Sequence, residues 1–129
     1  MIIFVQKSAL IYAAKRMADE HKTIYAIKDE NAFESALKRA ENRLFYDKTA
    51  DLFDLAAEYA FGFVKNHPFC DGNKRLAYIA CRLFLLLNGQ DFELSEDEKY
   101  QAIINLAASR LTKDGFAELI REKDKNETV

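Results

Sequence analysis

The chain has 129 residues, of which half are hydrophobic and 31% are charged, and its formal net charge is -2. These values suit one folded domain over residues 1–129 and exclude an intrinsically disordered chain. Because charges of both signs are interspersed and form no basic stripe, we expect no direct nucleic-acid binding. The longest apolar run, LAYIACRLFLLL, is interrupted by Arg82 and is too short to span a bilayer, so we expect no membrane segment.

Two further features favour a cytoplasmic location. The N-terminal stretch MIIFVQKSALIYAAKR is apolar but has no basic leader before its apolar part, which is atypical of a signal peptide. The two cysteines, Cys70 and Cys81, lack the spacing of a metal or redox pair. They are typical of reduced thiols in a cytoplasm.

The first third of the chain predicts helices that flank a short extended segment. Scarce glycine and a single proline favour helices throughout, and apolar residues at helical spacing predict a first helix from about Lys7 to His21. The segment KTIYAIK, residues 22–28, is rich in β-branched and aromatic residues and indicates a small extended flap. Asn31 with Glu34 resembles a capping box and predicts a helix to about Asn42.

Two strongly apolar helices are predicted in the middle of the chain. Thr49 or Asp51 begins the first, and its apolar residues cover most of its circumference, so it should be buried. The second runs from about Asn73 to Leu87 and ends at Asn88-Gly89.

The last part of the chain predicts two shorter helices. Ser95 with Glu98 is a second capping box, which predicts a helix to about Ser109. Thr112 caps a last short helix, and the polar tail from about residue 124 should fray. The predicted fold class is therefore all-α, with a small extended flap near residues 22–28.

The segment NHPFCDGNKR, residues 66–75, lies between the two apolar helices and carries an unusual concentration of polar groups. Gly72 lets the backbone approach a ligand closely. Asn73, Lys74 and Arg75 fall in the first turn of the following helix, where free N–H groups and the helix dipole attract anions. Two cations are unfavourable for a helix at that end, so a bound anion such as phosphate explains their presence.

The same segment supplies groups that could act on a phosphate. Asp71 is a carboxylate of the kind that holds Mg²⁺ beside phosphates, and His67 can take up a proton near neutral pH. Phe69 reads as a buried anchor. Each polar residue alone has a simpler interpretation as a turn or surface residue, but their joint occurrence favours attack of a hydroxyl on a nucleoside triphosphate.

The motif HPFCDGNKR resembles the active-site motif of the Fic/Doc superfamily, and more closely that of its death-on-curing branch of toxins. The segment DLFDLAAEYAFGFVKNHPFCDGNKRLAYIACRLFLLLNG, residues 51–89, is similar to the family's central helix–loop–helix. The segment KDENAFESALKRA is similar to the helix that follows the family's flap. This resemblance implies a compact Fic-fold bundle of about six helices.

By position, the resemblance implies a catalytic base at His67, a loop anchor at Phe69 and a Mg²⁺-binding acid at Asp71. It implies that the phosphates of ATP, the co-substrate, are contacted by the run that follows, Gly72, Asn73, Lys74 and Arg75. It also implies a flap that docks the target protein by strand addition, here Thr23, Ile24, Tyr25, Ala26 and Ile27.

Two departures bear on the reaction. AMP-transferring Fic members have glycine where this chain has Lys74 and an arginine where it has Tyr78, whereas death-on-curing toxins share the lysine and lack that arginine. The branch is implied to move the γ-phosphate of ATP to a threonine of elongation factor Tu and so to block translation. Because Gly72 departs from the death-on-curing pattern, AMP transfer stays an alternative, and a catalytically idle binding module is a third.

The flap and the mode of inhibition also depart from relatives. Relatives usually carry glycines in the flap, and this chain has none between Arg16 and Glu41, so a different target stays open. Self-inhibited Fic proteins carry Ser or Thr four residues before a Glu that precedes Gly or Asn, and neither Glu-Asn pair of this chain has one. We therefore expect a separate antitoxin, whose C-terminal segment binds an apolar groove involving the first helix or Phe61 and Phe63. The other interpretation of those two aromatics is core packing.

Overall fold

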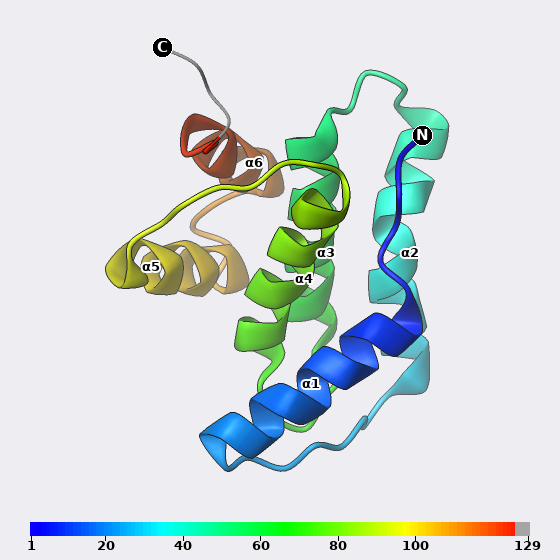
Figure 1. Ribbon diagram of the computed structural model, residues 1–129, viewed down its shortest axis with the longest axis vertical. Coiled ribbons are helices and arrows are strands. Elements are labelled where there is room, and N and C mark those ends of the chain that lie inside the picture. The colour runs from blue at the N-terminus through cyan, green and yellow to red at the C-terminus, as the bar shows by residue number, and fades with distance from the viewer. Residues whose placement is uncertain (126–129) are drawn as a thin grey trace.

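The computed structural model describes residues 1–125 and confirms the all-α prediction (Figure 1). Within these residues the chain forms six helices: α1 (Lys7–His21), α2 (Glu30–Tyr46), α3 (Leu52–Asn66), α4 (Asn73–Leu87), α5 (Glu96–Ala107) and α6 (Lys113–Glu122). None of these helices is long and apolar enough to cross a membrane. Most of the tail predicted to fray, residues 126–129, lies outside the described residues.

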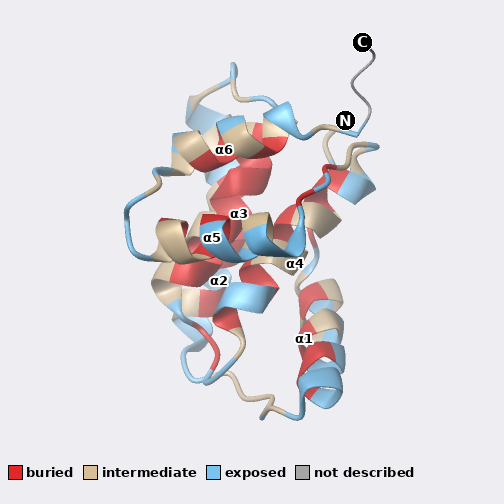
Figure 2. Ribbon diagram, turned by 90° about the vertical axis from the view of Figure 1, so that its left-hand side faces the viewer, coloured by how far each residue is buried: buried red, intermediate tan, exposed pale blue. Residues whose placement is uncertain are grey.

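Helix α3 forms the centre of the fold. Its apolar residues surround it on nearly every side, and most of them are buried against α2, α4, α5 and α6. Figure 2 shows this as a largely buried ribbon behind α5 and α6. Because α3 and α4 pack along each other, the loop that joins them is held from both sides by the core.

A buried carboxylate ties α3 to two neighbouring helices. Glu58 of α3 is only 1% exposed and lies 3.0 Å from Arg39 and 3.0 Å from Arg43, both on α2. Its third partner, Lys113 of α6, lies 2.8 Å away. Three cations around one carboxylate satisfy a charge that would be costly to bury alone.

Most predicted boundaries are confirmed, but both ends of the second helix are wrong. Helix α1 has the predicted bounds, and the capping box of Ser95 and Glu98 is present. Helix α2, however, does not begin at a box of Asn31 and Glu34. Asp29 caps it by accepting from the N–H of Ala32, so the helix begins before Asn31 and continues past residue 42 to Tyr46.

The two aromatics of α3 proposed for a groove have different environments. Phe63 is fully buried in the core, so it lines no groove. Phe61 is half-buried, and Arg39, Lys65 and Lys113 lie over its ring at 4.8, 5.9 and 5.7 Å. These contacts favour a structural role for both rings.

Candidate active site

The loop between α3 and α4 begins at His67, in an unusual backbone conformation. His67 is the C-cap of α3 and has φ 47° and ψ 55°, in the left-handed region that most side chains avoid. Its own N–H donates to the carbonyl of Phe63 at 3.3 Å, and the residue is exposed. This conformation turns the chain sharply out of α3 and leaves the imidazole at the surface.

Phe69, for which the sequence suggested an anchoring role, is buried in the core. It is 3% exposed, and its ring packs against the rings of Phe33 at 5.3 Å and Tyr25 at 5.8 Å. Burial of an aromatic side chain between two others fixes the loop by both area and ring geometry. The residues on either side of Phe69 therefore have a defined position.

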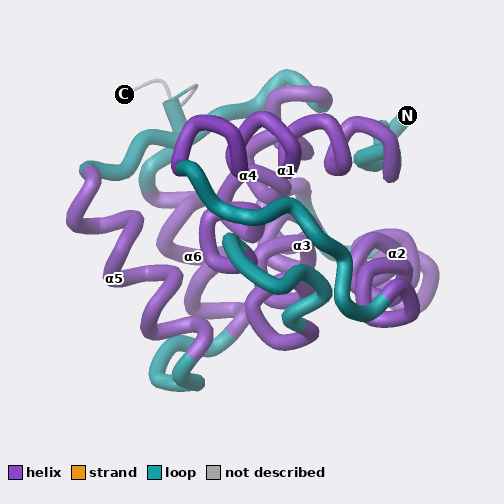
Figure 3. The backbone as a smooth tube through the Cα atoms, turned by 90° about the horizontal axis from the view of Figure 1, so that it is seen from below, coloured by secondary structure: helices purple, strands orange, loops and turns teal. Residues whose placement is uncertain are grey.

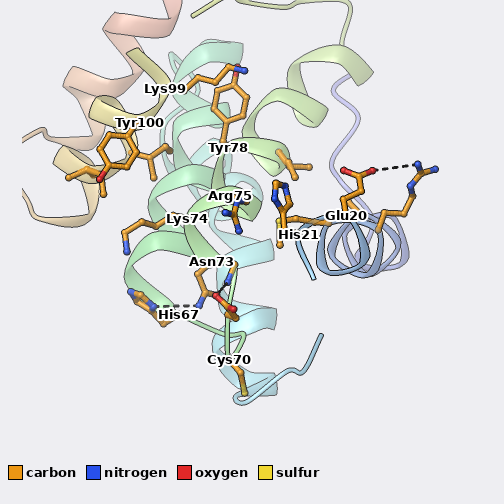
Figure 4. Close-up of a pocket in the computed structure, with 18 of the residues that line it drawn as sticks. Glu20, His21, His67, Cys70, Asn73, Lys74, Arg75, Tyr78, Lys99 and Tyr100 are labelled. Carbon is orange, nitrogen blue, oxygen red and sulfur yellow. Dashed lines mark hydrogen bonds and ion pairs between the residues drawn. The ribbon is translucent and has the colours of Figure 1, made fainter. Parts of the chain in front are cut away.

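Asn73 holds the loop from the start of α4. Its Oδ1 accepts from the N–H of Phe69 at 3.0 Å, and its Nδ2 donates to the carbonyl of Phe69 at 2.8 Å. These two bonds determine how the amide is oriented, because an N–H only donates and a carbonyl only accepts. The same Nδ2 lies 3.5 Å from His67 Nδ1, at the outer limit of a hydrogen bond, so it restricts the imidazole ring only loosely (Figure 4).

The position of this amide bears on the phosphate role predicted for Asn73. The residue is 7% exposed and both ends of its amide bind the loop. In this structure its side chain therefore fixes the backbone of Phe69 and makes only a weak contact with His67. Only its backbone N–H, in the first turn of α4, is placed to serve an anion.

The segment predicted as a flap, residues 22–28, is hydrogen-bonded to the loop between α3 and α4. Within residues 1–125 it forms no β-strand. A single antiparallel bridge joins Ile27 to Phe69. The N–H of Cys70 donates to Ala26 at 2.9 Å, and the N–H of Lys28 donates to Pro68 at 2.9 Å. Figure 3 shows the two loops running side by side, so the flap contributes to holding the motif in place.

The start of α4 has the features of an anion site. Gly72 is the N-cap, with φ 81°, and no side chain caps the helix. The first-turn residues Lys74 and Arg75 are exposed, and neither forms an ion pair with any carboxylate of residues 1–125. Asp71 accepts from the N–H of Gly72 at 2.8 Å through one oxygen. The start of α4 thus carries two exposed cations that have no ion-pair partner among residues 1–125, with the carboxylate of Asp71 nearby.

A cleft of about 960 Å³ brings these residues together (Figure 4). Its lining includes six of the residues predicted from the motif, His67, Asp71, Gly72, Asn73, Lys74 and Arg75. Phe69 lies beneath the loop, and flap residues 23–27 do not line the cleft. The walls also include residues of α1 and α5 that the sequence did not single out, among them Tyr12, Glu20, Lys99 and Tyr100.

The site offers little to a metal ion on its own. Within residues 1–125 no group of three or more His, Cys, Asp or Glu side chains could hold one. Asp71 is exposed, and one of its oxygens is engaged by Gly72. Its other oxygen suits Mg²⁺ that takes its remaining ligands from water and nucleotide phosphates, which is the usual arrangement for this ion.

The two cysteines differ in accessibility. Cys70 is exposed in the loop and Cys81 is buried in α4, and neither forms a disulfide. Burial raises the pKa of the Cys81 thiol, which keeps it protonated and unreactive.

Comparison with known proteins shows which family the chain belongs to. The model of the Fic/DOC family matches residues 4–85, which include α1, α2, α3, the loop and most of α4. The chain belongs to the Fic/DOC family. It is similar to the protein named "Protein kinase doc" of Escherichia phage P1, with 36% identity over 61 residues. That alignment covers 47% of this chain and 48% of the phage protein, so the chain matches about half the length of this relative.

Proposed function

We propose that the chain is a toxin that transfers the γ-phosphate of ATP to a hydroxyl side chain of a target protein. The observation that carries this proposal is the uncapped start of α4, whose unpaired cations Lys74 and Arg75 share one cleft with His67. The family membership and the kinase name of the phage relative support the same reaction class. By family resemblance the target is elongation factor Tu, and its modification blocks translation.

In this reaction the loop and the start of α4 have separate roles. The target hydroxyl attacks the γ-phosphorus, its proton passes to His67, and the bond from the γ-phosphorus to the bridging oxygen breaks to release ADP. The backbone N–H groups at the start of α4, with Lys74 and Arg75, hold the phosphates in line. Asn73 and Phe69 hold the loop against the core, and this places the backbone of His67 beside that cradle.

Asp71 is the residue that would hold Mg²⁺ at this site. The ion would neutralise charge on the phosphate oxygens. Asp71 is the one carboxylate that the motif brings to the cleft, and a single carboxylate supplies too few ligands to hold the ion alone. We therefore expect Mg²⁺ to bind tightly only together with ATP.

A second candidate is transfer of AMP or another nucleotide to the same hydroxyl. Lys74 is exposed, so its side chain does not by itself fill the space between the loop and the helix start. His67 would serve as the base for either reaction. The two reactions differ in whether the α- or the γ-phosphorus lies opposite the attacking oxygen.

The proposed regulation is inhibition in trans. A cognate antitoxin would bind through its C-terminal segment, and α1 contributes one wall of the cleft that such a segment could reach. A small reading frame for an antitoxin directly upstream of the coding sequence would support this part of the proposal. A long solitary transcription unit would count against it.

The reaction is tested with the purified protein, Mg²⁺, a bacterial lysate and ATP labelled at either the α- or the γ-phosphorus. We expect label to enter a protein from γ-labelled ATP only and to be lost in His67→Ala. His21→Ala is the matched control, because His21 is the other histidine at the cleft and has no role in the proposed reaction. Transfer from α-labelled ATP would establish the second candidate, and no transfer from either would favour a binding module.

A further inference from the structure

Helices α1 and α3 both end at a residue in the left-handed conformation, but the backbone closes the two ends differently. At α1 this residue is Lys22, with φ 54°, and the N–H of the next residue, Thr23, donates to the carbonyl of Ala18 at 2.9 Å. That bond fixes the direction in which the chain leaves the helix. At α3 the left-handed residue is His67, and the next residue is Pro68, which has no N–H to donate. The end of α3 therefore lacks the backbone bond that closes α1.

The side chain of Asn66 supplies a hydrogen bond at this point. Asn66 is the last residue of α3 and the peptide neighbour of His67, and it is half-buried. Its Nδ2 donates to the carbonyl of Ala32, in the first turn of α2, at 3.0 Å. Ala32 is itself held, because its N–H donates to the capping carboxylate of Asp29 at 3.0 Å. The end of α3 is thus tied to the start of α2 by a side chain.

The residue on the other side of His67 is bound to the same part of α2. The carbonyl of Pro68 accepts from the N–H of Lys28 at 2.9 Å and from the N–H of Asp29 at 3.2 Å, and Pro68 is buried. His67 itself is exposed and lines the cleft (Figure 4). A residue in a sparsely populated backbone conformation keeps it only where its surroundings determine it. Here both peptide neighbours of His67 are held by residues 28–32.

We propose that Asn66 is a positioning residue for His67, because its bond to Ala32 sets the direction in which the imidazole leaves α3 towards the cleft. This inference rests on the proposed function, since it assumes that His67 takes the proton of the attacking hydroxyl. Asn66 does not line the cleft, so it acts through His67 and not on the nucleotide. A base must lie within hydrogen-bond reach of the hydroxyl, so loss of the bond lowers the rate of transfer and leaves the binding of ATP unchanged.

The test compares Asn66→Ala with Asn88→Ala in the full chain, at a temperature where both variants are folded. Asn88 is the C-cap of α4, and its Nδ2 donates to the carbonyl of Ile3 at 2.8 Å, so it also ties a helix end to another segment, but outside the cleft. We expect Asn66→Ala to lower kcat for γ-phosphate transfer by roughly 10- to 100-fold with an unchanged KM for ATP. It should also move the Cα and Cβ chemical shifts of His67, which depend on φ and ψ.

The other variants separate this role from a purely structural one. Asn88→Ala should lower the melting temperature and change neither kcat nor the shifts of His67. Asn66→Asp keeps the shape of the side chain, but its carboxylate only accepts hydrogen bonds, so it should behave like Asn66→Ala. It also provides a folded variant if Asn66→Ala does not fold.

The possible results distinguish this inference from the proposed reaction. Unmoved shifts of His67 in both Asn66 variants, or an equal loss of kcat in Asn88→Ala, overturn the positioning role. An unchanged kcat in both Asn66 variants also overturns it. If wild type transfers no label, but the shifts of His67 move in the Asn66 variants and not in Asn88→Ala, then Asn66 positions His67 and the proposed reaction fails.

Discussion

Two helices of this domain begin in the same unusual way, and they differ in one respect. Neither α1 nor α4 has a side chain that caps its first turn, and both begin with cations. At the start of α1, Lys7 is neutralised by Glu34 at 2.6 Å and Glu30 at 3.3 Å. At the start of α4, Lys74 and Arg75 have no such partners among residues 1–125.

The comparison indicates that a cation at a helix start is paired with carboxylates where its role is structural, and is left unpaired where a ligand is expected to bind. The structural solution at α1 supplies carboxylates from α2, and α2, α3, α5 and α6 all use a capping side chain. At α4 no carboxylate of residues 1–125 forms an ion pair with the cations, and a cleft is present. A phosphate supplied by a ligand would complete the site.

The largest expected effect comes from removing the proposed base beside the open helix start. We expect His67→Ala to lower the rate of phosphate transfer by roughly 10²- to 10⁴-fold, because that is the usual contribution of a general base. The affinity for Mg²⁺-ATP should change little, since in the proposed function α4 holds the phosphates. Single-turnover transfer and calorimetry measure the two quantities, and a variant with full activity would remove His67 from the mechanism.

Replacing one lysine by glutamate at each helix start tests whether only the start of α4 binds ATP. Lys74→Glu should weaken ATP binding by roughly 10- to 100-fold, since it removes a charged contact. It should also stabilise the fold by roughly 0.3–1 kcal/mol, because an acid suits that end of a helix.

Lys7→Glu is the matched variant at α1. It would place a third acid beside Glu30 and Glu34, so we expect a lower melting temperature and an unchanged ATP affinity. Thermal unfolding and calorimetry check both variants. Equal effects on ATP binding would mean that the two helix starts do not differ in function.

Arg82 of α4, unlike Lys74 and Arg75, has an ion-pair partner, so it shows how a paired cation of the same helix affects stability. Arg82 lies 3.0 Å from Asp91 and, through its hydrogen bond, lowers the pKa of that carboxyl to about 2. Because the pKa is depressed on folding, this pair stabilises the protein above about pH 4, and the contribution is lost as the pH falls towards 2.

Asp91→Asn should therefore cost about 1–2 kcal/mol at neutral pH, and less as the pH falls. Urea unfolding of both proteins at pH 7 and pH 2.5 measures the difference. A pH-independent difference would show that packing, and not the ion pair, accounts for it.

The smallest expected effect concerns the glycine that precedes the open helix start. Gly72→Ala should destabilise the fold by about 1 kcal/mol, because φ is 81° and a side chain is strained there. The added Cβ would also meet the flexible end of the Met17 side chain, which lines the cleft. Gly89→Ala has a similar φ of 79° and open space, so it should cost a similar amount without affecting ATP binding.

The sequence predicted the helices well where the signals are local. Capping residues such as Asp51, Ser95 and Thr112 lie next to the N–H groups that they satisfy, and Gly72 and Gly89 flank α4 as expected. The start of α2 was missed because Asp29, two residues before the predicted cap, takes the same role.

The site was predicted only as far as one segment contains it. His67, Asp71, Lys74 and Arg75 lie together because they are nearly consecutive. The wall provided by Tyr100 comes from a helix more than twenty residues further along, and only packing of α5 against α4 brings it to the cleft. The direction of the Asn73 amide likewise depends on the folded loop, so its role as a clamp on Phe69 has no sequence signal.

The most direct test of the central claim is a titration of the ¹⁵N-labelled protein with Mg²⁺-tripolyphosphate, followed by amide chemical shifts. We expect large shifts for the amides of Asn73, Lys74 and Arg75 at the start of α4. We expect none for residues 7–9 at the start of α1, where Lys7 is already neutralised. Shifts of similar size at both helix starts, or none at α4, would contradict the claim that α4 begins at a phosphate site.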